Sequence, residues 1–163
     1  MRYLSGNDAE EAMHYLNLAA GIAEKATCER HKCGSIVVAE GKVIGTGFNS
    51  PPADLGSQRR CSYSKDSYDK RVTDKTCCMH AEQRAVFDSL KNNPGKINGS
   101  RLYFIRLDED GGMAKSGEPY CTICSKTALD CGIKEFILWH EAGICAYDTG
   151  EYNTLSYNYR DKR

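Results

Sequence analysis

Two short stretches of the sequence carry side chains that could bind a metal ion. His80 and Glu82 stand two residues apart at the start of one predicted helix, and Cys121 and Cys124 lie one helical turn apart at the start of another. Zinc prefers thiolate and imidazole ligands in tetrahedral geometry. One imidazole and two thiolates leave the fourth position open for water, as a catalytic zinc site requires. We therefore predict that His80, Cys121 and Cys124 bind zinc.

Glu82 follows His80 by two residues, so in a helix it points in a different direction and need not be a metal ligand. A carboxylate beside the metal can accept a proton from water and later deliver it to a leaving amine. We predict that Glu82 is the catalytic residue. The alternatives are a redox role for the Cys-x-x-Cys pair and a purely structural zinc site. A closed structural site has no use for such a carboxylate, which favours catalysis.

The motifs resemble those of the cytidine and deoxycytidylate deaminase superfamily over roughly residues 10 to 145. The residues that carry the resemblance are Cys33–Val38, Gly47–Pro52, Cys78–Glu82, Cys121–Cys124 and Cys131–Glu135. Histidine, glutamate and paired cysteines at this spacing form the zinc deaminase signature. The layout is most similar to the deoxycytidylate deaminase branch. Tyr120 departs from the usual motif, because it stands between the proline and the first cysteine and changes the loop that lines the base pocket.

The resemblance implies a zinc-dependent hydrolytic deaminase. Such an enzyme converts an exocyclic amine of a pyrimidine nucleotide or nucleoside, of the dCMP or cytidine type, to a carbonyl and releases ammonia. It also implies that Asn49 contacts the sugar or base, and that the backbone amide of Ala81 contacts the ring carbonyl. The implied fold is a three-layer α/β/α sandwich with a central mixed sheet of about five strands. Members of the superfamily are commonly oligomeric, so we expect a homo-oligomer.

Helical and extended patterns alternate along the chain and predict the elements that position these residues. The predicted elements are a helix over 7–26, strands over 35–39 and 43–48, a helix over 80–91, a strand over 101–107, a helix over 121–131 and a strand over 135–140. The first two strands are close enough to form a hairpin. Asn7 is the predicted N-cap of the first helix, with Glu10 as its capping-box partner. We expect an α/β fold with helices on both faces of the sheet, in a single deaminase domain over residues 1–163.

The chain after residue 140 leaves two topologies open. Residues 141–143 are too few for a crossover helix before another parallel strand. Either a short strand over 144–147 returns antiparallel, or the sheet ends early. Asp148 and Glu151 stand at capping-box spacing and predict a final short helix.

Residues 50–79 form a long polar stretch with little periodicity, which is usually functional or braced by a metal in a compact domain. Five cysteines lie in or near it: Cys28, Cys33, Cys61, Cys77 and Cys78. A second, structural zinc bound by four of them, or by three plus His31, would fix the loop. The alternative is that they are small buried hydrophobes. We expect that the adjacent Cys77 and Cys78 can hardly bind the same ion comfortably.

The same stretch holds a run of cationic side chains: Arg59, Arg60, Lys65, Lys70 and Arg71. Such a run usually means only that the charged side chains face the solvent. The more specific alternative is that these side chains bind a nucleotide phosphate.

Over the whole chain 22 basic residues balance 22 acidic ones. Proteins that bind nucleic acid usually carry a basic excess, so the balance favours a small-molecule substrate. A deaminase acting on a base within RNA or single-stranded DNA is the alternative.

Two further features concern where the protein works. The sequence has no apolar run near the roughly 18 residues of a membrane span, and its first residues lack the apolar core of a signal peptide. We therefore expect a cytoplasmic protein without a membrane partner. In a reducing compartment, its nine cysteines are better explained by metal binding or buried thiols than by disulfides.

Overall fold

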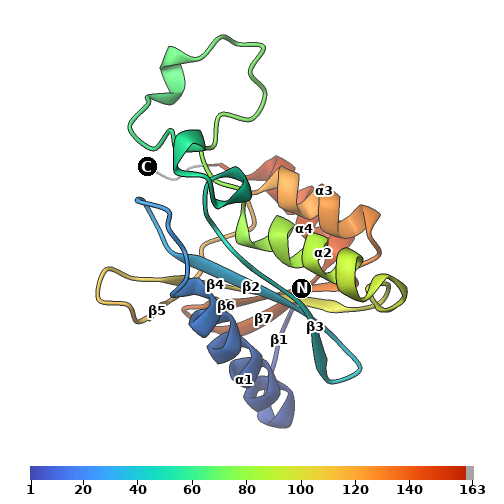
Figure 1. Ribbon diagram of the computed structural model, residues 1–163. Coiled ribbons are helices and arrows are strands. Elements are labelled where there is room, and N and C mark those ends of the chain that lie inside the picture. The colour runs from blue at the N-terminus through green and yellow to red at the C-terminus, as the bar shows by residue number, and fades with distance from the viewer. Residues whose placement is uncertain (161–163) are drawn as a thin grey trace.

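The computed structural model describes residues 1–160 of the chain and folds them into an α/β/α sandwich (Figure 1). The strands of the described residues are β1 (Arg2–Tyr3), β2 (Cys33–Ala39), β3 (Lys42–Phe48), β4 (Arg101–Leu107), β5 (Met113–Ala114), β6 (Glu135–His140) and β7 (Gly143–Asp148). Their α-helices are α1 (Gly6–Ala23), α2 (Ala81–Asn92), α3 (Thr122–Asp130) and α4 (Thr149–Asn158). The predicted single domain extends to residues 161–163, which lie outside this description.

One mixed sheet forms the middle layer. Its strand order is β1-β7-β6-β4-β2-β3, with β5 attached to β4. The neighbours β4 and β6 run parallel, and the other pairs are antiparallel. This confirms the predicted central mixed sheet, and β4 and β6 have the predicted bounds. The last long strand returns antiparallel, since Glu135 faces Asp148 and His140 faces Gly143 across β6 and β7. The sequence prediction missed β1 and β5, which have two residues each.

Helices cover both faces of the sheet, as predicted. On one face α1 buries Leu16 and Ala19 against Ile36, Tyr103 and Ile137 of the strands. On the other face α2, α3 and α4 share a second core, to which Phe136 of β6 belongs (Figure 1). Both faces of the long strands are therefore buried, which explains their nearly continuous apolar runs.

Two glycines of β3 allow α2 to lie unusually close to the sheet. A Cβ atom on Gly47 would lie 2.2 Å from the carbonyl oxygen of Ala81 and 2.4 Å from the amide nitrogen of Ala85. One on Gly45 would lie 2.1 Å from the Oγ of Ser89. No side chain fits in these gaps, so the glycines fix the distance of α2 from the sheet and hence the position of its N-terminus.

The start of α1 differs from the prediction. The helix begins at Gly6 and has Ser5 as its N-cap, so Asn7 lies inside the first turn and the predicted capping box is wrong. Gly6 has a φ of +54°, a conformation that glycine adopts at little cost. The helix also ends at Ala23, three residues before its predicted end.

The segment between β3 and α2 is irregular, as predicted, and projects from the sandwich as a lobe (Figure 1). Within it the described residues form only single turns of 3-10 helix, at Pro52–Asp54, Gly56–Gln58 and Lys65–Ser67. A bridge between Ser50 and Met79 closes its base. Residues 50–79 are called the lobe below.

None of the helices in residues 1–160 is both long enough and apolar enough to cross a bilayer.

Candidate functional site

The two predicted metal-binding stretches meet at the N-termini of α2 and α3. His80 is the N-cap of α2, and its backbone N–H donates to the Oε1 of Gln83 at 3.2 Å. Cys121 is the N-cap of α3, and the N–H of Cys124 points at the Cys121 sulfur. The first N–H groups of a helix lack partners within it and carry its positive dipole end, which favours thiolates at this place.

His80, Cys121 and Cys124 form a compact set of three ligand atoms. The Nδ1 of His80 lies 3.3 Å from the Sγ of Cys121 and 3.2 Å from the Sγ of Cys124, and the two sulfurs are 3.2 Å apart. A tetrahedral zinc with bonds of about 2.0 Å to nitrogen and 2.3 Å to sulfur has edges of roughly 3.5–3.8 Å. The three atoms need to move apart by only about 0.2–0.6 Å, so the donor set fits zinc.

The side chains of the cluster shift one another's pKa values. Hydrogen bonds with Cys124 and with His80 lower the pKa of the Cys121 thiol to about 4, against the effect of burial. The hydrogen bond to Cys121 is also the main cause that raises the pKa of His80 to about 9. The lowered pKa favours the thiolate of Cys121, the form in which cysteine binds a metal ion. A metal ion would take the place of the protons.

Glu82 lies beside this cluster. Its side chain is only 7% exposed, and its carboxyl group hydrogen-bonds to the thiol of Cys124. Burial raises the pKa of the carboxyl group, because the charged form loses its contact with water. A buried carboxyl group held beside the metal-binding side chains can accept a proton and donate it again, as general acid–base catalysis requires.

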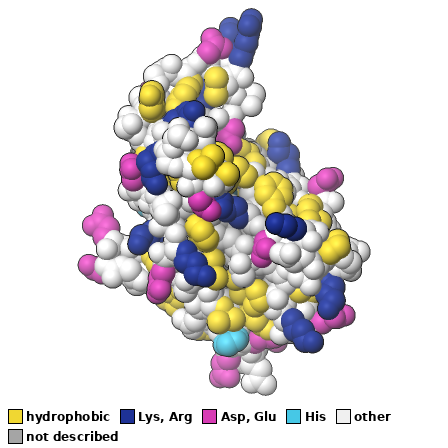
Figure 2. All heavy atoms as spheres, in the orientation of Figure 1, with side chains coloured by type: hydrophobic (Ala, Val, Ile, Leu, Met, Phe, Trp, Pro, Cys, Tyr) yellow, Lys and Arg dark blue, Asp and Glu magenta, His cyan; other side chains and the backbone are white. Residues whose placement is uncertain are grey.

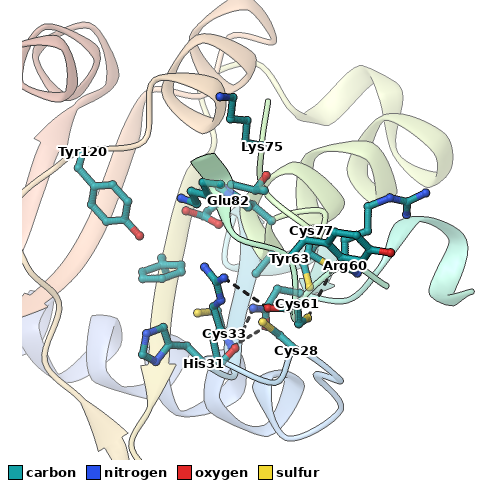
Figure 3. A pocket seen from close by; sticks show the side chains of 18 residues that line it. Cys28, His31, Cys33, Arg60, Cys61, Tyr63, Lys75, Cys77, Glu82 and Tyr120 are labelled. Carbon is teal, nitrogen blue, oxygen red and sulfur yellow. Dashed lines mark hydrogen bonds between the residues drawn. The ribbon is translucent and has the colours of Figure 1, made fainter. Parts of the chain in front are cut away.

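A cavity opens in front of Glu82 (Figure 3). Its lining includes Asn49 and Ala81, the two predicted substrate contacts, and also Cys33, Phe104 and Tyr120. The hydroxyl of Tyr120 points into the cavity in Figure 3, and the Tyr120 ring lies 5.7 Å from the ring of Tyr159. Burial raises the pKa of the Cys33 thiol to about 12, so Cys33 is a neutral wall residue. The sequence analysis did not predict that Cys33, Phe104 and Tyr120 line the cavity, although the irregular motif around Tyr120 indicated an unusual loop at this place.

The amide of Asn49 joins the end of β3 to the segment before β2. Its Nδ2 donates to the carbonyl oxygen of His31 at 2.8 Å, and its Oδ1 accepts from the N–H of Cys33 at 2.8 Å. One amide hydrogen and one oxygen lone pair remain for a ligand. Asn49 therefore lines the cavity in an orientation fixed by two backbone contacts.

Only two residues of the predicted cationic run line the cavity. Arg60 and Lys65 line the cavity, together with Arg30 and Lys75. Arg59 pairs with Glu29 at 3.4 Å instead. The residues found to line the cavity do not include Lys70 and Arg71.

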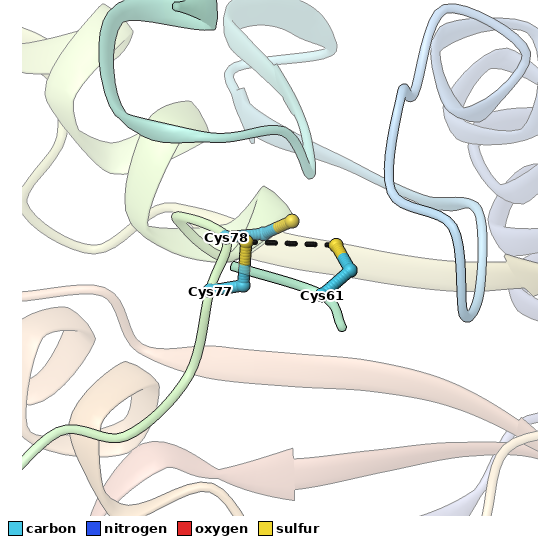
Figure 4. A group of neighbouring side chains, drawn as sticks. All are labelled: Cys61, Cys77 and Cys78. Atoms are coloured by element: carbon cyan, nitrogen blue, oxygen red, sulfur yellow. Dashed lines mark hydrogen bonds between the residues drawn. The ribbon is translucent and has the colours of Figure 1, made fainter. Parts of the chain in front are cut away.

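A second group of possible metal ligands lies along the same cavity. The sulfurs of Cys61, Cys77 and Cys78 all lie within 4.8 Å of one another (Figure 4). The sulfurs of the adjacent Cys77 and Cys78 thus lie closer together than the sequence led us to expect, and both lie near the sulfur of Cys61. Cys33 lies outside this group of three.

Comparison with known families gives one clear match. The family model described as "Cytidine and deoxycytidylate deaminase zinc-binding region" matches residues 8–140. The deoxycytidylate deaminase of Mycobacterium phage D29 is 27% identical over 130 residues, which cover 76% of this chain and 90% of the phage protein. That of Saccharomyces cerevisiae is 28% identical over 129 residues, which cover 76% of this chain but only 36% of the yeast protein.

Solved structures show the same fold. The dCMP deaminase from cyanophage S-TIM5, in complex with dCMP and dUMP, has a TM-score of 0.55 at 25% identity, with 82% of each chain covered. The cytidine deaminase from Burkholderia pseudomallei has a TM-score of 0.56 at 19% identity, with 86% of this chain and 94% of that chain covered.

Proposed function

The chain belongs to the cytidine and deoxycytidylate deaminase family, and on that premise we propose that it is a zinc-dependent hydrolytic deaminase of a free pyrimidine nucleoside monophosphate. One observation carries the proposal. A set of one histidine and two cysteines that fits zinc lies at two helix N-termini, with the buried Glu82 beside it at the floor of a cavity.

His80, Cys121 and Cys124 hold the zinc in this proposal. Zinc bound there supplies a Lewis acid that lowers the pKa of water at the open coordination position. The three side chains balance much of the metal charge, and the packing of α2 and α3 fixes their directions. His80 binds through Nδ1, because that atom faces both sulfurs.

Glu82 moves the protons. Water adds its oxygen to the ring carbon that carries the exocyclic amine, and Glu82 takes a proton from the water. Glu82 gives this proton to the ring nitrogen. It then takes the remaining proton of the former water and gives it to the departing amine, so that the carbon–nitrogen bond breaks and a carbonyl and ammonia form. Its burial beside Cys124 holds the carboxyl group in place for both transfers.

The remaining cavity residues bind the substrate. The backbone N–H of Ala81 belongs to the first turn of α2, so it has no partner within the helix and can donate to the ring carbonyl. The free amide hydrogen of Asn49 points to a role in sugar or base binding. Phe104 and Tyr120 supply aromatic walls for the pyrimidine.

A phosphate group on the substrate is supported by the cations that line the cavity: Arg30, Arg60, Lys65 and Lys75. Arginine and lysine bind phosphate through charge-assisted hydrogen bonds. On the face drawn in Figure 2, by contrast, basic and acidic side chains are interspersed without a continuous basic track. Proteins that bind single-stranded nucleic acid usually have such a track along the path of the strand. The surface therefore supports a free nucleotide as the substrate rather than a nucleic acid.

A substrate panel tests the proposal. Zinc-replete protein is incubated with dCMP, CMP, deoxycytidine, cytosine and a cytosine-containing single-stranded oligonucleotide, and ammonia release is followed. We expect the monophosphates to have the highest kcat/KM. Deamination of the oligonucleotide without turnover of any free nucleotide would overturn the proposal and favour a nucleic-acid deaminase.

Two further predictions concern the oligomeric state and the cellular compartment of the protein. Phe87, Leu90 and Leu129 expose between 39% and 48% of their surface on α2 and α3, which supports a homo-oligomer that light scattering can measure. All nine cysteines are free, which suits a reducing compartment such as the cytoplasm.

A further inference from the structure

We propose that Cys28, Cys61, Cys77 and Cys78 bind a second zinc ion, which fastens the lobe to the segment between α1 and β2. These four cysteines are called the loop cluster below. They come from three stretches of chain that have no regular secondary structure at these positions.

The sulfur positions carry the proposal. Cys61, Cys77 and Cys78 lie within 4.8 Å of one another, and the sulfurs of Cys61 and Cys77 are 3.5 Å apart (Figure 4). The thiol of Cys28 hydrogen-bonds to that of Cys78 and supplies a fourth sulfur. Three sulfurs at such distances, with the Cys28 sulfur beside that of Cys78, provide the ligands of a tetrahedral zinc site made of four cysteines, whose edges measure roughly 3.8 Å for bonds of about 2.3 Å.

The surroundings of the sulfurs differ from those of buried hydrophobic cysteines. All four side chains are partly exposed, whereas Cys145 is fully buried in the core. The backbone N–H of Arg60 donates to the Cys77 sulfur at 2.9 Å, and the Arg59 guanidinium donates to the Cys61 sulfur at 3.8 Å. Donors aimed at sulfur stabilise a thiolate, and they are the typical outer contacts of metal ligands.

The lobe also has few other attachments that could hold this arrangement. Arg59 donates to the carbonyl oxygen of Thr27 at 2.7 Å and pairs with the exposed Glu29. Arg30 donates to the carbonyl oxygen of Cys61 at 3.4 Å. Exposed contacts of this kind contribute little, whereas ordering a long loop is costly. A metal bound across the three stretches would supply the missing free energy.

The position of the loop cluster in sequence gives the ion a role in catalysis, and this step rests on the proposed function. Every cation that lines the cavity stands within four residues of a cluster cysteine. Arg30 follows Cys28 by two residues, Arg60 precedes Cys61, and Lys75 precedes Cys77 by two. Figure 3 shows the labelled Arg60 and Cys61 on the same wall of the cavity. The second zinc therefore positions the side chains that bind the substrate phosphate.

Metal content tests the site itself. Wild type, Cys61→Ser and the control Cys131→Ser are purified, and zinc per chain is measured by elemental analysis. Cys131 is partly exposed at the end of α3 and belongs to neither group of ligands. We expect about two zinc ions in wild type and in the control, and about one in Cys61→Ser. About one ion in all three proteins would overturn the proposal.

Cobalt binding to wild type tests the second site even if the variant fails to fold or zinc is lost during purification. Metal-free wild type is titrated with Co²⁺, and the sulfur-to-cobalt absorption is followed. We expect that absorption to rise until about two equivalents are bound. Saturation at about one equivalent, or a Cys61–Cys77 disulfide found by thiol counting and mass spectrometry of fresh protein, would contradict a site made of four thiolates.

Kinetics tests the positioning role separately. In folded Cys61→Ser with one zinc, we expect the KM for the nucleoside monophosphate to rise about tenfold, with kcat and the KM for the nucleoside nearly unchanged. An equal loss on both substrates, or no loss on either, would remove the link to phosphate. If no substrate were turned over by wild type, the proposed function would fail, while the metal count would still decide the second zinc.

Discussion

The two groups of metal-binding side chains differ in what builds them. His80, Cys121 and Cys124 stand at the N-termini of two helices that pack on the sheet, with glycines of β3 fixing the distance of α2. The loop cluster joins three irregular stretches, two of them in the lobe. Both offer thiols to a metal, but only the first has its geometry set by regular elements.

This difference separates two uses of zinc. A site held by packed helices can keep an open coordination position and a catalytic carboxyl group beside it, because the protein itself maintains the arrangement. A site made from loops depends on the ion for its order, as structural zinc sites do. We expect damage to the first to abolish chemistry, and damage to the second to weaken substrate binding and stability.

The largest effect is expected from Glu82→Gln, which should abolish turnover at the first site without changing the zinc content. The variant keeps the shape of the side chain but cannot take a proton from water, so turnover should fall by about 10²–10⁴-fold or more. Zinc content should stay at the wild-type value, because Glu82 is not one of the three ligands. Initial rate and metal content are measured on the same sample. A near-normal rate would remove Glu82 from the mechanism, and loss of zinc would make it a ligand.

Gly47→Ala tests whether helix packing sets up the first site. The new Cβ would meet backbone atoms of α2 at 2.2–2.4 Å, so the helix must move. We expect a loss of about 1–3 kcal/mol in unfolding free energy and at least a tenfold loss of kcat. Denaturant unfolding and steady-state rates measure both quantities.

Gly21→Ala is the matched control, because its Cβ meets nothing within 4 Å and it lies within α1. That variant should be as stable as wild type or more so, since alanine favours a helix by roughly 0.5–1 kcal/mol. Equal behaviour of the two variants would mean that the close approach of α2 is unimportant.

Arg60→Ala tests the cavity wall that the lobe provides. The side chain lines the cavity but touches neither Glu82 nor the three catalytic ligands in the contacts observed here. We expect the KM for a nucleoside monophosphate to rise about tenfold with kcat nearly constant, and the nucleoside to be unaffected. Lys70→Ala, in the same run but outside the cavity lining, should behave as wild type. A similar effect of both variants would point to general electrostatics.

The smallest effect is expected from Asp148→Ala, at a helix end remote in sequence from both groups of ligands. The carboxylate accepts from the N–H groups of Gly150 and Glu151 at 2.9 and 3.2 Å. Removing this N-cap should lower the unfolding free energy by about 1 kcal/mol and leave kcat and zinc content unchanged. Thermal unfolding checks the first value. If Asp148→Ala lost a zinc ion, a general loss of stability would be enough to release zinc, and zinc loss in the cysteine variants would no longer identify ligands.

The sequence predicted the regular parts of the fold well. Arg101–Leu107 and Glu135–His140 are strands with the predicted bounds, because their apolar and aromatic residues are buried on both faces. The predicted cap at Asp148 is confirmed, since its acceptor role depends only on local spacing. Asn7 is not the N-cap because the helix already begins at Gly6, after Ser5 in extended conformation, so that Asn7 lies inside the first turn.

What the sequence could not supply depends on contacts between distant residues. Strands β1 and β5 have two residues each and exist only through their partners β7 and β4. The amide of Asn49 is held by the backbone of His31 and Cys33, a contact that no local pattern indicates. The adjacent cysteines 77 and 78 share one cluster because the chain turns there.

One comparison of two variants tests the central claim that the two groups of cysteines divide the work. Cys121→Ala and Cys61→Ser are each measured for zinc per chain and for turnover of dCMP. The account predicts that Cys121→Ala keeps about one zinc and its fold but loses turnover, while Cys61→Ser keeps about one zinc and a near-normal kcat with a raised KM. Near-normal turnover by Cys121→Ala would contradict the account.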